Sequence, residues 1–502
     1  MTTKSGSVPE ENVSAAGGRE ASPSPASPEL TGGEGYTYED GVAGVYAVAL
    51  LCETTAPGLP GRTVTRLSLQ QGAFGEPLDD VVVDGVAADS TTARLSLQVK
   101  RSLVVSGAES NVDFRETILR AHATLVRPGF RRTVDRVGVV TGEISDGRKR
   151  VFEALCEWAR TSIDAPSFIR KVRSDEHRSA LDAVRSILAG TLPEAALDEA
   201  EHLLLSHFVL MRFEMLHEGS VTEASTVASL ADHLHATERS RADDLWRRIL
   251  ALVRVSQGRA AEFDRKTLVA RMNGAFHLMG APSLRRNLAH LSEDARLAAA
   301  EIANGIGGVN IARPRFIDAA HSALEQHRFV QLGGLAGTGK SAVLRAMVEK
   351  QLERGPVLFL KADRLTGSSW SQYETSLGLE RCDLDALLVE LAAAGTSTLF
   401  IDGLDRVEVR HRGVVVDVVN TILDSQLLGN WKVLATVRDT GLEPLRTWLP
   451  GALLGRDGNE GRGRLASRRC RIKGPRRKEA QTAAAALRHQ ASARHRAPAI
   501  LR

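Results

Sequence analysis

Four residues near the middle of the chain have the types and spacing of a phosphate-binding loop. Gly334, Gly339, Lys340 and Ser341 fit the pattern G-x-x-x-x-G-K-S within FVQLGGLAGTGKSAVL. Glycines let backbone N–H groups turn toward phosphate oxygens, and the N-terminus of a following helix adds the positive end of its dipole. Lys340 would then reach the β- and γ-phosphates, and the Ser341 hydroxyl would ligate Mg²⁺. The spacing therefore predicts a site for ATP and Mg²⁺.

The surroundings of this loop favour the same interpretation. Residues 329–332 form a short apolar run that predicts a buried strand, and residues 341–347 predict the helix that follows. A strand, a glycine-rich loop and a helix in this order are the context that the motif requires. We expect the remaining loop residues Ala336, Gly337 and Thr338 to contact the nucleotide as well.

Two apolar segments downstream end in polar side chains that suit the same site. Residues 398–402, TLFID, predict a strand that delivers Asp402 to its C-terminal end, where the carboxylate can hold the hydration shell of Mg²⁺. Asp405 follows closely and is the candidate for orienting the attacking water. Residues 432–438, KVLATVR, predict another buried strand, and Arg438 at its end could sense the γ-phosphate. From the residues alone, a surface arginine at a strand end is an equal alternative.

A second group of polar residues occurs in the first hundred positions. Asp80 directly precedes a run of valines, and Gln98 and Lys100 share one face of a later predicted strand because they are two residues apart. Cleavage of a phosphodiester needs an acid to bind Mg²⁺ and a lysine to stabilise the developing charge. Glu39, at the predicted start of a helix, offers a further acid. We therefore predict a catalytic group of these four residues, with Asp80 as the metal ligand.

This second group of residues also allows two alternative interpretations. Asp79 and Asp84 lie close enough in sequence to replace Asp80 as the metal ligand, and Asp80 is preferred because it directly precedes the valine run. Glutamine and lysine are also common on the solvated face of an amphipathic strand. The pattern alone therefore does not distinguish a catalytic face from a solvated one.

The predicted elements give an α/β protein with a helical middle region. Helical spacing over 40–52 precedes predicted strands at 64–69, 81–83 and 93–99, a helix at 114–126 and a strand at 134–141. Residues 148–312 are mainly helical, with 203–216 as a possible strand. A second α/β block follows, with a strand at 357–361 and a helix at 414–427. We expect domains at 35–215 and 313–450, a helical linker at 216–312, and a disordered segment at 1–34.

Composition excludes several classes of protein. The 502 residues are 43% hydrophobic, yet no apolar run is long enough to span a membrane, and the N-terminus lacks a secretion signal. We therefore expect a cytoplasmic protein that makes no membrane contact. The four cysteines lie far apart, in neither a metal-binding spacing nor a disulfide framework.

Residues 451–502 differ from the rest of the chain. They contain 14 Lys+Arg and 3 Asp+Glu, a net charge of +11, so the remainder of the chain carries about +4 − 11 = −7. They also lack aromatic residues and apolar periodicity. One interpretation is a basic tail that binds nucleic acid. We favour the other, a frameshifted segment that is not native coding, because the preceding domain stops before it is complete.

The segments FVQLGGLAGTGKSAVL, TLFIDGLDRV and KVLATVRD, in that order, resemble the NTPase of the STAND class, near NACHT and AAA+ proteins. The resemblance covers about residues 313–445. It implies the strand order 5-1-4-3-2, with Lys340 on strand 1, Asp402 on strand 3 and Arg438 on strand 4. It also implies a fifth strand, a helical lid, a winged helix and a sensor array, none visible before the tail. We therefore expect strand 1 to be an exposed sheet edge, and little ATP-dependent assembly, although a full-length relative could form homo-oligomers.

The order of Asp80, Gln98 and Lys100, within LDDVVV and LQVKRS, resembles the D…QxK variant of the PD-(D/E)xK nucleases. The similarity is greatest to the double-stranded DNA endonuclease domains of bacterial antiviral effectors and Mrr-type restriction proteins, over about residues 35–215. Together with a STAND NTPase it implies antiphage defence, with double-stranded DNA as substrate and a phage-derived trigger. The alternatives are a non-enzymatic nucleotide-dependent regulator, a protein that binds nucleic acid through its basic tail, and an inactive gene product.

Overall fold

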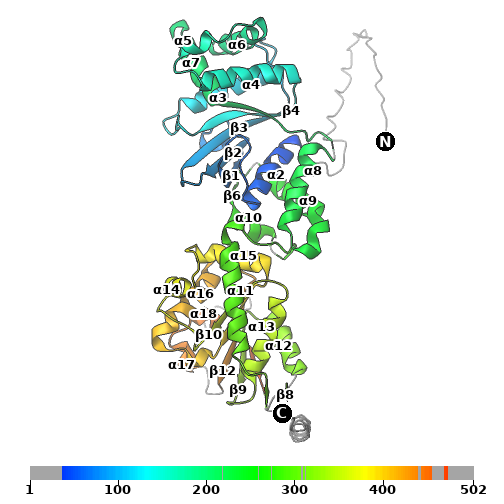
Figure 1. The fold of residues 1–502 in the computed structure, drawn as a ribbon, viewed down its shortest axis with the longest axis vertical. Helices are drawn as coiled ribbons and strands as arrows, with labels where there is room; N and C mark the ends of the chain where they lie inside the picture. The colour runs from blue at the N-terminus through cyan, green and yellow to red at the C-terminus, as the bar shows by residue number, and fades with distance from the viewer. Residues whose placement is uncertain are drawn as a thin grey trace, which may run out of the picture. The chain divides into compact units, whose positions relative to one another are not determined.

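The computed structural model describes residues 37–217, 219–257, 259–272, 274–306, 309–310, 313–438, 443–454 and 468–472. The segment predicted to be disordered, 1–34, and most of 451–502 lie outside these residues. The elements below belong to one compact unit, Tyr38–Arg502. Within the described ranges, no helix combines the length and the apolar character that crossing a bilayer demands. The α/β class with helical regions is confirmed (Figure 1).

The N-terminal module is built on a six-stranded mixed sheet in the order β5-β4-β3-β2-β1-β6. Strands β6, β1, β2 and β3 are antiparallel neighbours, whereas β3, β4 and β5 run parallel. This register places the residue before β2 opposite the second half of β3. The strand bounds are β1 Thr63–Leu69, β2 Val81–Val86, β3 Thr92–Ser102, β4 Arg136–Glu143, β5 Phe208–Arg212 and β6 Glu262–Asp264.

Helices cover both faces of this sheet (Figure 1). Helix α2 packs between one face and α9, so it is apolar around almost its whole circumference. A side chain at Gly44 of α2 would collide with the ring of Trp246, since a Cβ there would lie 2.7 Å from that ring. The other face carries α3, α4, α6 and α7. The bounds are α2 Tyr38–Leu51, α3 Val112–Leu125, α4 Asp146–Arg160, α5 Ala165–Ile169, α6 Asp175–Leu188, α7 Glu194–His207, α8 Val221–His233 and α9 Ala242–Ser256.

Part of the segment predicted as a helical linker contributes to this module. Strand β6 pairs with β1, and α9 packs on α2. The linker segment continues with α10 Arg265–Met272, α11 Arg285–Ala300 and the two short strands β7 Gly305–Ile306 and β8 Val309–Asn310. Short 3₁₀ turns in the chain are η1 Gln71–Phe74, η2 Ala236–Arg241, η3 Pro282–Leu284, η4 Leu404–Arg406, η5 Val409–His411 and η6 Gln426–Leu428.

The C-terminal module contains a five-stranded, wholly parallel sheet in the order β10-β11-β12-β9-β13. Parallel strands are buried on both faces, which explains why their sequences are continuous apolar runs. The strands are β9 Phe329–Gly334, β10 Leu358–Lys361, β11 Thr398–Asp402, β12 Lys432–Arg438 and β13 Arg468–Arg471. The helices are α12 Pro314–Gln326, α13 Lys340–Leu352, α14 Trp370–Ser376, α15 Leu384–Ala394, α16 Arg412–Asp424, α17 Glu443–Arg446 and α18 Gly451–Leu454.

The expectation of a missing fifth strand is wrong. Strand β13 lies within the basic segment and pairs in parallel with β9, so β9 is not a sheet edge. The Ile472 amide donates to the Gly333 carbonyl at 2.7 Å, and the Ile472 side chain is buried in the same core as Val330 and Leu332. The sequence RRCRI conceals this strand because an edge strand buries only alternate residues: here Ile472 is buried and Cys470 is partly buried. The pairing also removes one reason for expecting no ATP-dependent assembly.

Truncating Ile472 should destabilise the C-terminal module if β13 belongs to its core. The side chain is only 2% exposed, so Ile472→Ala should lower the free energy of unfolding by about 2–4 kcal/mol. Urea unfolding followed by tryptophan fluorescence measures this loss. Val409→Ala is the matched control, because Val409 is 76% exposed and its truncation should cost little. Equal unfolding midpoints for the two variants would contradict the placement of β13.

Candidate functional site

The phosphate loop connects β9 to α13 and takes its shape from glycines. Gly337 and Gly339 have φ angles of 74° and 84°, in the left-handed region that residues with a Cβ rarely adopt. Gly339 immediately precedes α13, so the backbone turns directly into the helix N-terminus. Ala336 is exposed at the tip of the loop, and the Thr338 hydroxyl donates to the Leu335 carbonyl at 2.9 Å. The backbone therefore has the form that a phosphate cradle needs.

Lys340 is held close to this loop. Its Nζ donates to the backbone carbonyls of Gly334 and Leu335, each at 2.9 Å. Burial lowers the pKa of Lys340 below its usual value, and the nearby Asp405 and Asp402 carboxylates partly oppose that shift. Both partners are neutral oxygens, so the ammonium can exchange them for phosphate oxygens without breaking an ion pair.

Asp402, the last residue of β11, connects β12 to the first turn of α13. Its Oδ1 accepts hydrogen bonds from the Ser341 hydroxyl at 2.8 Å and the Thr436 hydroxyl at 2.7 Å. The Thr436 oxygen in turn accepts from the Gly403 amide at 2.7 Å. Asp402 is 2% exposed, and its Oδ2 lies 3.6 Å from the Arg406 guanidinium. A hydroxyl and a carboxylate at this separation are hard oxygen ligands that fit Mg²⁺.

A cavity of about 420 Å³ adjoins this group. The predicted residues Gly337, Gly339, Lys340, Ser341 and Asp402 line it, together with basic and acidic side chains that the motifs did not identify: Glu301, Arg313, Lys361, Asp363 and Arg406. For two of these residues the sequence did contain a signal. Lys361 ends the predicted strand at 357–361, and ligands of parallel sheets gather at such strand ends. Arg406 directly follows Asp405. The cavity therefore combines basic side chains with nearly as many acidic ones.

Arg438 and Asp405 lie next to each other but outside the lining of this cavity. The Arg438 amide donates to Asp405 Oδ1 at 3.1 Å, and its guanidinium Nε lies 3.6 Å from Asp405 Oδ2. The Arg438 side chain is 56% exposed. The roles of Arg438 as a γ-phosphate sensor and of Asp405 in orienting water stay predictions.

In the N-terminal module, the sheet brings Asp80 and Gln98 into direct contact. Asp80 Oδ2 accepts from Gln98 Nε2 at 2.5 Å and from the Val99 amide at 2.7 Å. Burial raises the pKa of Asp80 to about 6, the Val99 amide lowers it, and the carboxylates of Glu39 and Asp79 raise it further. A carboxyl with this pKa changes charge close to neutral pH.

Glu39 completes an acidic group at this position. It lies in the first turn of α2 and accepts from Gln70 Nε2 at 3.2 Å. Its pKa is raised, chiefly by burial. The described residues contain no cluster of three or more His, Cys, Asp or Glu suited to a metal ion. A cation here would therefore need a neutral ligand too, and the buried Gln98 Oε1, which accepts no hydrogen bond from any described group, fits that need.

Lys100 faces α3. Its Nζ lies 2.8 Å from Asp113 Oδ1 and 3.8 Å from Glu116 Oε2. Its charge also lowers the pKa of Asp80, so the ammonium interacts with Asp80 as well as with the acids of α3. Asp113 is 58% exposed, and a pair with such an exposed partner is weak. Lys100 therefore lies near Asp80, and its ion pair with Asp113 is weak enough to be replaced by another anion.

The alternative metal ligands Asp79 and Asp84 are bound to arginines. Asp79 Oδ1 lies 2.8 Å from Arg120, and Asp84 receives two hydrogen bonds from Arg94, at 2.8 and 3.2 Å. Asp80 accepts from a glutamine and a backbone amide instead. This contrast favours Asp80 over its neighbours as the cation ligand.

Comparison with known proteins found no matching family model and no matching curated protein. Solved structures of Cap4 SAVED/CARF-domain receptors gave low similarity. The Acinetobacter baumannii receptor with the cyclic trinucleotide 3′3′3′-cAAA is 11% identical at a TM-score of 0.29, covering 74% of this chain and 61% of that one. The Moraxella osloensis receptor is 14% identical at a TM-score of 0.27, and the match covers 73% of this chain and 64% of that receptor. The chain thus spans less than two thirds of either receptor, and such scores are too low to indicate a shared fold.

Neutralising Asp80 should stabilise the protein at neutral pH. Its folded pKa of about 6 lies above that of an unfolded aspartate, so its ionisation destabilises the fold increasingly as pH rises from about 4 through 6. Asp80→Asn should therefore add about 1–3 kcal/mol at pH 7.5 in metal-free buffer and little at pH 4. Urea unfolding at both pH values measures the difference. A variant destabilised equally at both would show that the carboxylate is not under strain.

Proposed function

We propose that this chain joins an ATP-binding NTPase of the STAND type to a Mg²⁺-dependent double-stranded DNA endonuclease, and that it acts in antiphage defence. The observation that carries the proposal is the convergence of Lys340, Ser341 and Asp402 on one cavity. The pairing of Asp80 with Gln98 beside Lys100 supports the nuclease half. The phage-derived trigger and the cytoplasmic location belong to the same proposal.

In the NTPase half, the loop backbone would hold the phosphates and Lys340 would exchange its two carbonyl partners for β- and γ-phosphate oxygens. Ser341 and Asp402 would hold Mg²⁺, which when bound supplies positive charge against the charge that develops on the phosphates. Asp402 is already oriented by Thr436, so it need not reorganise on binding. Arg406 would leave its position 3.6 Å from Asp402 as the cation arrives.

In the nuclease half, Asp80 and the free oxygen of Gln98 would hold Mg²⁺, which when bound supplies Lewis acidity to the scissile phosphate. Lys100 would exchange Asp113 for that phosphate and stabilise the developing charge. Glu39 would add a further acid from α2.

A second candidate function is a nucleotide-dependent regulator whose N-terminal module binds a partner without cutting. The lack of a three-acid metal cluster among the described residues favours it. Both candidates share the ATP site, so the cleavage assay below distinguishes them.

Replacing Lys340 should weaken ATP binding, because its ammonium would contact the β- and γ-phosphates. Lys340→Ala in the full chain should raise the Kd for Mg-ATP more than tenfold, as measured by isothermal titration calorimetry. Lys350→Ala provides the control, since Lys350 is exposed farther along the same helix and should leave the Kd unchanged. Equal affinities for all three proteins would refute the assignment of the site.

Replacing Lys100 should slow DNA cleavage without preventing DNA binding. Lys100→Ala should reduce plasmid nicking with Mg²⁺ or Mn²⁺ by roughly a hundredfold or more, because the charge that develops on the phosphate loses its partner. Binding to a labelled duplex should change little, since it depends on many phosphate contacts. Lys171→Ala, on an exposed surface, is the control. If wild type and Lys100→Ala nick at the same rate, the strand face is only a solvated surface.

A further inference from the structure

A second cavity, of about 450 Å³, lies at the end of the N-terminal sheet that is remote from Asp80. It is bordered by the beginning of β4, by β5, by α4 and by the loop between α2 and β1. Arg136, the first residue of β4, is paired with Leu95 early in β3, whereas Lys100 occurs later in β3. At about 3.3 Å per residue, Leu95 and Lys100 are roughly 17 Å apart, so the two sites are distinct.

Three arginines line this cavity, and two of them have no carboxylate partner. Arg160 is paired with Glu157 at 3.2 Å. Arg136 donates to the backbone carbonyl of Asp135 at 2.9 Å and forms no ion pair with any described carboxylate. The Arg62 side chain makes no hydrogen bond or ion pair with any described residue, and its Nε is buried; its backbone bonds to Leu59 and Ala56. The cavity therefore contains guanidinium groups with unused donors.

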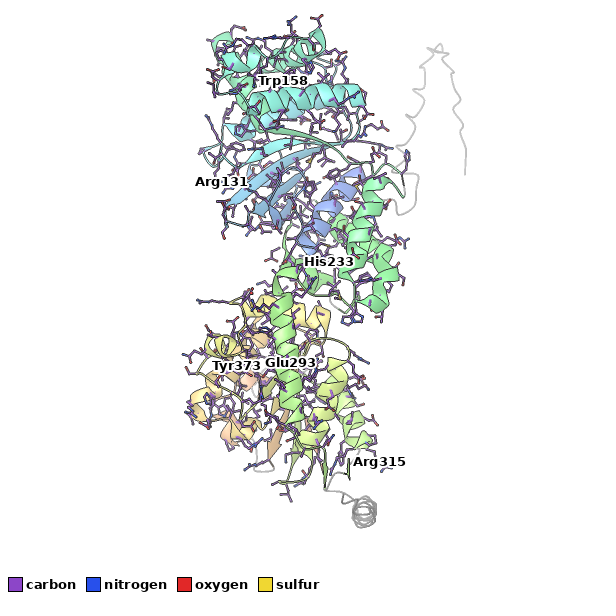
Figure 2. All side chains as sticks on the ribbon, in the orientation of Figure 1. Arg131, Trp158, His233, Glu293, Arg315 and Tyr373 are labelled. Carbon is purple, nitrogen blue, oxygen red and sulfur yellow. The ribbon has the colours of Figure 1, made fainter. Side chains whose placement is uncertain are left out.

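Other arginines around the same sheet, in contrast, each form an ion pair with a carboxylate. Arg94 lies 2.8 Å from Asp84, Arg120 lies 2.8 Å from Asp79, and Arg131, labelled in Figure 2, lies 2.8 Å from Asp135. Burial lowers the pKa of Arg136, the charges of Arg160 and Arg62 lower it further, and the Asp135 carboxylate partly opposes this shift. Partly buried cations that repel one another are costly, so an anion bound among them would relieve that cost.

The acids near the cavity do not neutralise these two arginines. Glu153 is bound to Lys149 at 2.6 Å, and Glu157 is bound to Arg160. The rest of the lining is largely apolar and offers a surface for a flat group: Leu59, Val134, Cys156, Phe208, Leu210 and Met211. The cavity thus combines an anion-binding part with an apolar part.

We propose that this cavity binds a small phosphorylated ligand of the nucleoside monophosphate class. Arg62 and Arg136 would bind the phosphate, since a guanidinium can donate two parallel hydrogen bonds to it. The base would lie against the apolar side chains. A recess of this size encloses most of a small ligand, whereas a DNA backbone needs a continuous open groove. The site is additional to the phosphate loop and to the Asp80 face.

Isothermal titration calorimetry with AMP as the probe tests the proposal. The full chain carries Lys340→Ala, so that the phosphate loop does not contribute. AMP should bind this protein, and Arg62→Gln or Arg136→Gln should weaken binding by roughly tenfold or more. Arg62→Lys, which retains the charge, should recover part of the affinity. Arg66→Gln and Arg150→Gln are matched controls on β1 and α4 and should have no effect; Arg66 is 53% exposed.

Several results would overturn the proposal. One is the absence of AMP binding by the Lys340→Ala protein; another is equal affinity in the Arg62, Arg136 and control variants. A third is a loss of affinity for a 20-base-pair duplex without any AMP binding, which would make the arginines a DNA backbone contact. Circular dichroism and urea unfolding of the arginine variants show whether the N-terminal module folds, because Mg-ATP binding reports only on the C-terminal module.

Discussion

The carboxylate of Asp402 is the contact on which the C-terminal module's site depends. It accepts from Ser341 after β9 and from Thr436 on β12, while Asp402 itself ends β11. One buried acid thus connects two neighbouring strands, β11 and β12, to the first turn of α13. A buried carboxylate is tolerable only when its oxygens are hydrogen-bonded, and here two hydroxyls and a nearby guanidinium serve that purpose. The lone pairs of these hydroxyl oxygens can also turn toward a cation. The same groups could therefore stabilise the fold and bind a metal ion.

Asp80 shows a different balance in the N-terminal module. It too is hydrogen-bonded, to Gln98 and the Val99 amide, but burial and the carboxylates of Glu39 and Asp79 outweigh those bonds and raise its pKa to about 6. Ionisation of Asp80 therefore costs part of the fold's stability at neutral pH. Such destabilised acids concentrate at functional sites, which separates Asp80 from its arginine-bound neighbours.

Much of the architecture could be predicted because the relevant signals are local. A phosphate loop needs glycines at fixed positions, and buried parallel strands need continuous apolar runs, so β9, β11 and β12 were predicted at their observed positions. The contact of Asp80 with Gln98 could not be predicted from the sequence, whereas the two-residue spacing predicted that Gln98 and Lys100 share one face of β3. Local patterns thus identified the elements and the direction of several side chains.

Long-range pairing explains what the sequence did not reveal. Strand β13 contains three arginines among its four residues and becomes a strand only because β9 offers an unpaired edge. Lys361 and Arg406 had local signals in the sequence, but only the sheet order brings them to one cavity. The arginine cavity at the far end of β4 likewise assembles Arg62, Arg136 and Arg160 from positions far apart in sequence.

The two lysines proposed to bind phosphate have different partners in this structure, and the partner determines how readily each lysine can move to a phosphate. Lys340 rests on neutral carbonyls, so its transfer to a phosphate oxygen gains an ionic partner without losing one. Lys100 rests on Asp113, so a DNA phosphate must compete with an existing carboxylate. That carboxylate is more than half exposed, and solvent weakens such pairs to about 1 kcal/mol or less. A DNA backbone presents several closely spaced phosphates, each with one negative charge, and one of these can therefore displace Asp113.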